Sequence, residues 1–182
     1  MLIMMAGLPG TGKSTLAEAL AEALPATVLN KDRIRAALFD SVDYSSEQDD
    51  VCLEIMFLIA AYLLRTRPHT TLILDGRTFS RRYQIELVER FAREQRLNLR
   101  ILECVCSPST ARARLEHDQA RRSHPAANRT YELYSTVRAH FEPIREPKLV
   151  VDTDQDLRYC LVLCMAYLAG TDGSARPDAA NH

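Results

Sequence analysis

Short apolar runs alternate with amphipathic stretches along the whole chain. The runs have the length of β-strands, and in the stretches between them the apolar residues recur every three or four positions, as on one face of a helix. The expected strands are Met1–Ala6, Thr27–Leu29, Leu72–Leu74, Leu99–Val105 and Leu149–Val151. The expected helices are Lys13–Leu24, Asp32–Leu38, Ser46–Leu64, Ser80–Gln95, Pro108–Gln119, Tyr131–Phe141 and Asp156–Leu168. This alternation predicts an α/β protein with a five-stranded, mainly parallel sheet and helices on both faces.

The same pattern predicts the domain organisation. The 182 residues fit one domain, and no internal repeat or second domain is indicated, so residues 1–170 are expected to fold together. The small and polar residues of 171–182 predict a disordered tail. Ser46, followed three residues later by Asp49, is expected to form a capping box for the helix that runs to Leu64.

Polar residues follow each of the expected strands. In open parallel sheets, ligands bind beyond the carboxyl ends of the strands. Those ends are Gly7 onward, Asn30–Asp32, Asp75–Arg77, Cys106–Ser107 and Asp152–Thr153. We therefore expect these segments to meet at one edge of the sheet, although they are far apart in the sequence.

The first of these segments carries a phosphate-binding motif. It fits the pattern G-x-x-x-x-G-K-[ST], and it follows a strand and opens a helix, which is the context that the motif requires. Backbone N–H groups and the helix N-terminus favour a phosphate there. Lys13 is expected to reach the β- and γ-phosphates of ATP, and the Ser14 hydroxyl to ligate Mg²⁺. The expected nucleotide-binding residues of the loop are Gly7, Leu8, Pro9, Gly10, Thr11, Gly12, Lys13, Ser14 and Thr15.

Switch GTPases, ATPase motors and phosphotransferases all share such a loop. Asn30-Lys31-Asp32 resembles the guanine-binding N-K-x-D of GTPases, but its Asp comes one residue too early. Asp75-Gly76 is not the D-x-x-G of a γ-phosphate switch, and Gly76 stands where a hydrolysing motor usually has a Glu that activates water. The sequence therefore favours transfer of the γ-phosphate to an acceptor over transfer to water.

The segment after the second strand supplies a candidate general base. Asp32 and Arg35 are three residues apart at the start of a helix, so they share one face of it. Asp32 is expected to accept the proton of an attacking hydroxyl, and Arg35 to hold the acceptor or a phosphate that it carries. In the alternative interpretation, Asp32 caps the helix and Arg35 pairs with it.

Asp75 and Arg77 follow the third strand and are candidates for the same site. Asp75 is expected to hold Mg²⁺ through water or to contact the acceptor, and Arg77 to bind an anionic group of the substrate. The alternative is an Asp–Arg pair that orders the loop.

With GLPGTGKST, then NKDRIR, then LILDGRTFSRR, the chain resembles the P-loop kinases grouped with the 5′-kinase domain of phage polynucleotide kinase. Chloramphenicol phosphotransferase, zeta toxins, gluconate kinase and adenylylsulfate kinase are more distant relatives. The resemblance extends from Met1 to about Ala169. It implies a P-loop NTPase fold with an Arg-bearing lid over the ATP phosphates. It also implies that Asp32 is the general base and that Arg35 contacts the acceptor or the transferring phosphate.

The lid is expected at about residues 112–129, which hold five arginines. Phosphoryl transfer needs positive charge on the γ-phosphate oxygens, and a lid arginine commonly supplies it. Arg121 and Arg122, where the helix gives way to a loop, are the catalytic candidates. Arg114 is expected to lie against the adenine. In the alternative, several of these arginines form a solvated helix face that pairs with Glu116 and Asp118.

Charge and composition bear on the acceptor. The net charge of −1 argues against a general polyanion binder. The segment from Asp32 to Glu54 holds seven acids and two arginines, which disfavours a polynucleotide and favours a cationic or neutral polyol acceptor, unless these acids form a solvated loop. Without tryptophan, the aromatic residues available to stack a base near the site are Phe39, Tyr44 and Phe79.

The location and the chemistry follow from these patterns. Five cysteines without metal-site spacing predict buried thiols in a reducing cytoplasm, and no apolar run is long enough for a membrane span.

The leading hypothesis is an ATP- and Mg²⁺-dependent kinase that phosphorylates a hydroxyl of a small molecule. The second is a polynucleotide 5′-hydroxyl kinase, and the third is a nucleotide-binding or ATPase module that regulates a partner. The acceptor's identity and the oligomeric state stay open.

Overall fold

The computed structural model describes residues 1–121 and 128–170. Arg122 and the expected tail at 171–182 lie outside these ranges. Within them, every element expected from the sequence is present. The strands are β1 (Leu2–Ala6), β2 (Ala26–Asn30), β3 (Thr71–Asp75), β4 (Leu99–Val105) and β5 (Lys148–Asp152). The helices are α1 (Lys13–Ala23), α2 (Lys31–Leu38), α3 (Ser46–Thr66), α4 (Arg82–Glu94), α5 (Pro108–Arg121), α6 (Tyr131–Ala139) and α7 (Leu157–Leu168).

The five strands form one sheet in the order β2-β3-β1-β4-β5, and every pair is parallel. β1 lies in the middle because all five of its residues are apolar and buried, which suits a strand covered on both faces. The strand order reverses on either side of β1, so the loop after β1 lies at the switch point where such sheets bind ligands. This confirms the predicted P-loop NTPase fold.

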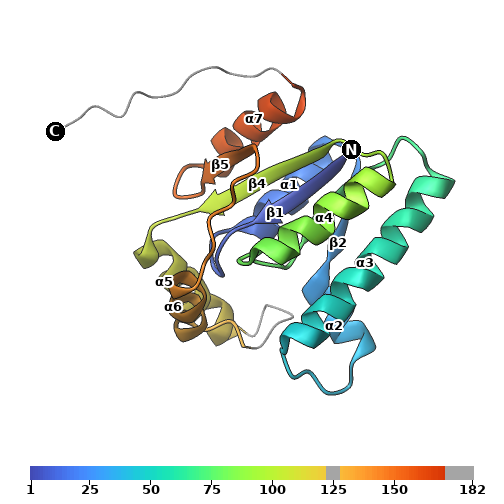
Figure 1. Ribbon diagram of the computed structural model, residues 1–182. Coiled ribbons are helices and arrows are strands. Elements are labelled where there is room, and N and C mark those ends of the chain that lie inside the picture. The colour runs from blue at the N-terminus through green and yellow to red at the C-terminus, as the bar shows by residue number, and fades with distance from the viewer. Residues whose placement is uncertain (122–127, 171–182) are drawn as a thin grey trace.

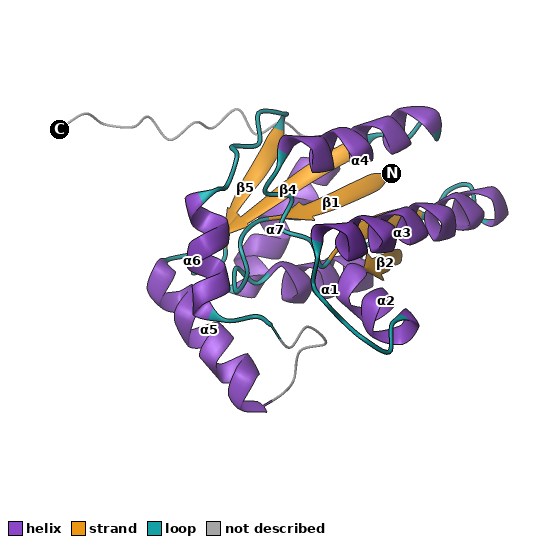
Figure 2. Cartoon of the chain, turned by 60° about the horizontal axis from the view of Figure 1, so that its bottom comes forward, coloured by secondary structure: helices purple, strands orange, loops and turns teal. Residues whose placement is uncertain are grey.

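The two faces of the sheet are covered by different helices (Figures 1 and 2). Leu2, Met4 and Ala6 point to a core shared with α3 and α4. Ile3 and Met5 point the other way, to a core shared with α1 and α7. This alternation is the two-residue period of a strand. Both apolar faces are thereby removed from water, and the polar residues are left at the strand ends.

Helices α5 and α6 lie beyond the carboxyl ends of the strands, away from both covering layers (Figure 1). They pack on each other through Ala111, Leu115 and Tyr134, and Leu8 of the phosphate loop packs against this small cluster. Helix α5, which holds the first part of the segment predicted to form a lid, therefore packs against the phosphate loop.

The predicted capping box at Ser46 is wrong by one residue. Ser45 is the N-cap of α3, and its Oγ accepts a hydrogen bond from the backbone N–H of Gln48 at 3.0 Å. Tyr44, with φ of 54°, turns the chain just before it, so the extended cap conformation falls on Ser45. The Asp49 side chain is consequently free of any capping role and reaches across to α2.

Two further expectations concern the cysteines and the membrane. The five thiols are free, and four of them are buried, whereas Cys106 is only half-buried. In the described part of the chain, no helix combines the length and apolar character that a membrane crossing needs.

Candidate active site

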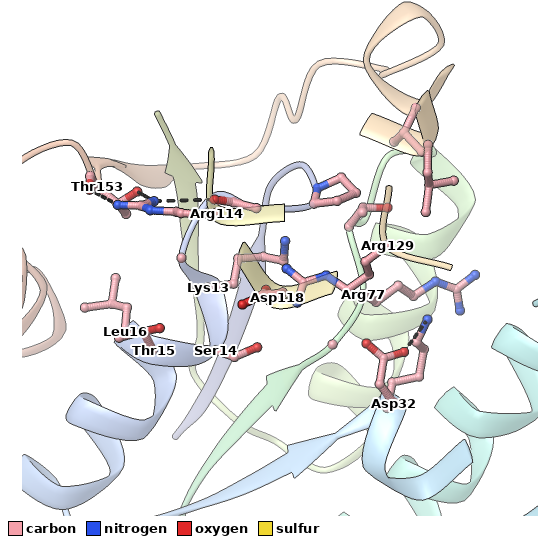
Figure 3. Close-up of a pocket in the computed structure, with 18 of the residues that line it drawn as sticks. Lys13, Ser14, Thr15, Leu16, Asp32, Arg77, Arg114, Asp118, Arg129 and Thr153 are labelled. Atoms are coloured by element: carbon pink, nitrogen blue, oxygen red, sulfur yellow. Dashed lines mark hydrogen bonds and ion pairs between the residues drawn. The ribbon is translucent and has the colours of Figure 1, made fainter. Parts of the chain in front are cut away.

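A cavity of about 570 Å³ opens at the carboxyl end of the sheet (Figure 3). It lies between the phosphate loop, the first turns of α2 and α3, and the helices α5 and α6. The structure brings most of the predicted site residues to its wall: Pro9, Gly10, Gly12, Lys13, Ser14, Thr15, Asp32, Arg35, Arg77 and Arg114. Residues as distant in sequence as Pro9 and Cys160 thus line one space.

The other predicted residues lie elsewhere. Gly7, Leu8 and Thr11 line a second cavity, behind the loop. Asp75 is buried directly behind Gly76, which does line the main cavity. Arg121 is exposed at the end of α5 and is not among the residues that line either cavity, and Arg122 lies outside the described residues.

The loop's glycines are dictated by its geometry. Gly7 has φ of 130°, and a Cβ there would lie 2.2 Å from the Cys104 carbonyl oxygen of β4. Gly12, at φ of 75°, occupies the left-handed region as the N-cap of α1. The chain can wrap around a phosphate only with residues that lack a side chain at these positions, which is why the motif is visible in the sequence.

Lys13 lies at the centre of the loop. Its Nζ donates hydrogen bonds to the carbonyl oxygens of Gly7 at 2.8 Å and Leu8 at 2.7 Å. Burial and, to a smaller extent, the nearby Arg129 guanidinium lower the pKa of Lys13 to about 8, against the raising effect of the Asp75 carboxylate. Because water does not solvate this ammonium well, it attracts anionic phosphate oxygens strongly.

Asn30 connects the ends of β2 and β3. Its Oδ1 accepts a hydrogen bond from the backbone N–H of Arg33 at 3.0 Å and so caps α2, while its Nδ2 donates to Asp75 Oδ2 at 2.7 Å. The alternative interpretation of Asp32 as the helix cap is therefore wrong, because Asn30 performs that task. Asp32 is left to face the cavity.

The Asp75 carboxylate suits a hard cation. Its side chain is buried, and its Oδ1 has no hydrogen-bond partner among the described residues. Mg²⁺ prefers oxygen ligands, retains several waters, and is usually held by one or two protein oxygens together with substrate phosphates. Ser14 Oγ on the cavity wall and Asp75 Oδ1 behind it supply oxygens of this kind. The described ranges hold no cluster of three or more His, Cys, Asp or Glu side chains that could bind a metal ion.

Asp32 belongs to a buried charge network. Its Oδ1 lies 3.2 Å from Arg35 NH1 and 3.3 Å from Lys31 Nζ. The pairing with Arg35 that the sequence allowed is present, and both residues also line the cavity. Gly76 fixes this arrangement, because its φ is 87° and a Cβ there would lie only 2.9 Å from the Lys31 backbone nitrogen. The end of β3 can therefore pack directly on the first turn of α2.

The sequence did not indicate the part that Lys31 and Asp49 play in this network. Lys31 Nζ lies 3.0 Å from Asp49 Oδ1, and Arg35 also forms an ion pair with Asp49. Burial lowers the pKa of Lys31 to about 8, against the raising effect of Asp32. Asp40 and Asp43 are exposed, as a solvated loop predicts, but Asp49 is turned inward by the start of α3. Only the packing of α3 beside α2 could reveal this.

Arg77 is paired in the same region. Its NH2 lies 2.5 Å from Asp50 Oδ1, and its NH1 donates to the Asp49 carbonyl oxygen at 3.4 Å. The predicted alternative of an Asp–Arg pair within the loop is thus replaced by a pair with α3, while Asp75 is bonded to Asn30 instead.

Arg129, which belongs to the predicted lid segment, lines the cavity near Lys13. Figure 3 shows its side chain between Lys13 and Arg77. It forms an ion pair with Asp118 of α5 at 3.3 Å, and burial lowers its pKa, with Asp118 opposing the shift. The sequence placed it within the lid, but only the tertiary structure shows that it points inward.

Arg114 lies on the other side of Lys13 from Arg129 (Figure 3), and its NH1 donates to the Gly10 carbonyl oxygen of the phosphate loop at 3.4 Å. Its NH2 donates to the Thr153 carbonyl oxygen at 2.7 Å and its NH1 to Thr153 Oγ1 at 3.0 Å. Gln155 and Leu157 line the wall beside it. Of the three aromatic candidates, Tyr44 lines the cavity with its ring 5.1 Å from the Arg35 guanidinium, whereas Phe79 is fully buried in the core.

The sequence from residue 2 to residue 144 matches the AAA domain family. This is more than half of the chain, so the protein belongs to that family. A search of the curated proteins finds no match to this sequence.

Solved structures share the fold. A gluconokinase from Sinorhizobium meliloti is 19% identical and has a TM-score of 0.64, covering 93% of this chain and 91% of that one. The APS kinase of Mycobacterium tuberculosis, in complex with AMPPNP and APS, is 17% identical with a TM-score of 0.71, covering 92% and 96%. Kti12 from Chaetomium thermophilum, in complex with ADP-AlF3, is 18% identical with a TM-score of 0.64, covering 91% and 97%. The likeness identifies the fold as that of the P-loop kinases and their relatives.

Proposed function

We propose that this protein is an ATP-dependent kinase that transfers the γ-phosphate to a hydroxyl group of a small molecule. The observation that carries the proposal is that the phosphate loop and the buried Asp32 carboxylate line one cavity. A nucleotide on the loop and an acceptor beside α2 would then meet within it. Two of the similar structures are named as kinases, and a third was solved with ADP-AlF3, which supports nucleotide chemistry on this fold.

The loop binds and orients ATP. Its backbone N–H groups and Lys13 would hold the β- and γ-phosphates, and Arg114 would lie at the nucleoside end of the cavity. Ser14 and Asp75 would hold Mg²⁺, the latter through water. When bound, Mg²⁺ neutralises the charge on the phosphate oxygens. Thr15 and the remaining loop residues complete the nucleotide site.

The transfer itself uses Asp32 and the arginines. The acceptor oxygen attacks the γ-phosphorus, the bond from that phosphorus to the bridging oxygen breaks, and ADP leaves with its electron pair. Asp32 accepts the proton of the hydroxyl. Arg35, beside Asp32, orients the acceptor, and Arg129 stabilises the transferring phosphoryl group. Gly76, in place of an acid that could activate water, supports transfer over hydrolysis.

An ADP-release assay with a panel of acceptors tests the proposal. The panel holds sugars, nucleosides, aminoglycosides and 5′-hydroxyl oligonucleotides, and the variants are Asp32→Asn, Lys13→Ala and the matched control Asp40→Asn. Asp32→Asn should keep ATP affinity within about threefold and lose about 10²–10⁴-fold in transfer. The exposed Asp40 lies outside the cavity, so Asp40→Asn should behave as the wild type. Transfer at the normal rate by Asp32→Asn would contradict its assignment as the base.

The same assay separates the other hypotheses. ATP turnover that no acceptor stimulates would favour a regulatory ATPase. Phosphorylation of a 5′-hydroxyl oligonucleotide that weakens steeply with salt would favour a polynucleotide kinase, because phosphate contacts release counterions.

A further inference from the structure

We call the part of the cavity around Asp32 and Arg35 the acceptor half. Three described cations are buried there, and each of them forms an ion pair. Lys31, Arg35 and Arg77 are at most 6% exposed. Among the described residues, the acids that pair with these cations are Asp32, Asp49 and Asp50, which is one acid for each cation.

Asp49 contacts all three of these cations. Its Oδ1 lies 3.0 Å from Lys31 Nζ and forms an ion pair with Arg35, and its backbone carbonyl oxygen accepts a hydrogen bond from Arg77 at 3.4 Å. One residue thus contacts all three cations. Because it stands in the first turn of α3, its position is fixed by the Ser45 cap and by the packing of α3 on α2.

The pairing decides which charge an acceptor can carry. A carboxylate or phosphate on the acceptor would have to displace Asp49 or Asp50 from a buried partner, and the displaced carboxylate would remain close to the new charge. A cationic acceptor would be repelled by the three buried cations, because the acids that could attract it are already paired with those cations. An uncharged compound would disturb none of the pairs, and its hydroxyl groups could still exchange hydrogen bonds with the paired carboxylate and guanidinium groups.

We propose that Asp49 is a specificity-determining residue that neutralises Lys31 and Arg35 and thereby selects an uncharged polyhydroxy acceptor over an anionic one. The proposal rests on the kinase function proposed above. Burial of the Lys31 ammonium supports it, since a desolvated cation without Asp49 would take up an external anion in its place.

Binding of sulfate tests the charge argument without catalysis. The protein is first saturated with AMPPNP, so that the phosphate loop is filled, and sulfate is then titrated by calorimetry. Asp49→Asn should bind sulfate at least about tenfold more tightly than the wild type, because Lys31 and Arg35 lose a counter-charge. Asp40→Asn removes the same charge from the same acidic stretch outside the cavity and should leave sulfate binding unchanged. Equal sulfate affinity in the wild type and Asp49→Asn would overturn the proposal.

Steady-state transfer tests the substrate class. Each neutral sugar is compared with its own acid or phosphate ester, glucose with gluconate and ribose with ribose 5-phosphate. The wild type should prefer the neutral member by at least about tenfold in kcat/KM, and Asp49→Asn should lose most of that preference through a lower KM for the anion. A wild-type preference for the anionic members would overturn the inference and leave the kinase function standing. Absence of transfer to any hydroxyl compound, with ATP binding intact, would instead contradict the kinase function, and the sulfate titration would still decide the charge argument.

Discussion

The side-chain amide of Asn30 bonds in two directions, to the start of α2 and to Asp75 at the end of β3. Its Oδ1 caps the helix at Arg33 N, and its Nδ2 lies 2.7 Å from Asp75 Oδ2. Because β2 and β3 are neighbours and Asn30 is the register partner of Asp75, the bond is built into the sheet. It sets the helix that bears Asp32 at a fixed position relative to Asp75.

Exchange of Asn30 for Asp should reveal this bond through a pH-dependent loss of stability. Asn30→Asp keeps a helix cap but sets two carboxylates at hydrogen-bond distance, so the free energy of unfolding should fall by about 2 kcal/mol at pH 7. Repulsion raises the pKa of one carboxyl, and its protonation as the pH falls restores a donor between the two groups. Urea unfolding at pH 7 and pH 5 should show that the difference from the wild type shrinks at the lower pH.

Asn30→Ser is the matched control for this experiment. Serine retains the cap without adding a charge, so its cost of about 1 kcal/mol should be the same at both pH values. A penalty for Asn30→Asp that does not change with pH would contradict the carboxylate pair.

The lowered pKa of Lys13 predicts that ATP binding weakens in alkali. The free protein loses the Lys13 proton as the pH rises through about 8, whereas bound phosphates would hold that proton to higher pH. When the bound phosphates restore the ordinary lysine pKa of 10.5, the Kd for ATP should rise about tenfold between pH 7 and pH 9. Calorimetry in two buffers of different ionisation enthalpy measures both the Kd and the proton taken up. Lys13→Ala should bind weakly at both pH values with little change between them.

Gly76→Ala should lower the free energy of unfolding by more than the strain of a positive φ alone would. The residue combines φ of 87° with a Cβ position 2.9 Å from the Lys31 nitrogen, so we expect a loss of about 3 kcal/mol and a larger loss of transfer than of ATP binding. Gly170 is the matched control, because its φ is 76° and, among the described residues, the atom nearest to a Cβ there would be Arg100 NH2 at 3.8 Å. Gly170→Ala should cost about 1 kcal/mol. Equal losses in urea unfolding would show that the contact with α2 is unimportant.

Arg129 and Arg121, two arginines of the predicted lid segment, should differ in their contribution to transfer. Arg129→Ala should lower kcat by about 10²–10³-fold, because a desolvated guanidinium is removed from the phosphate end of the cavity. Arg121 is exposed and lines no described cavity, so Arg121→Ala should change kcat by less than about twofold. Single-turnover kinetics at saturating ATP separate these effects from nucleotide binding. A larger loss for Arg121→Ala would reverse the assignment.

Much of the fold follows from sequence periodicity, because the strands are short, buried on both faces and separated by amphipathic helices. Even the alternation within β1, with Met4 on one face and Met5 on the other, follows from strand geometry. The cap of α3 was predicted one residue late because Ser45 and Ser46 have the same capping chemistry. The positive φ of Tyr44, which selects between them, is a feature of the folded chain.

The site divides in the same way. The sequence by itself determined the phosphate loop, since its glycines, lysine and serine are contiguous and their spacing is set by local backbone geometry. It also indicated Asp32 and Arg35, which share one helical turn. Only the tertiary structure placed Asp49 against Lys31 and Arg129 over the phosphate loop. Ion pairs form between groups that packing brings within a few ångströms, and neither the packing of α3 beside α2 nor the approach of Arg129 to Lys13 is encoded in the spacing of those residues.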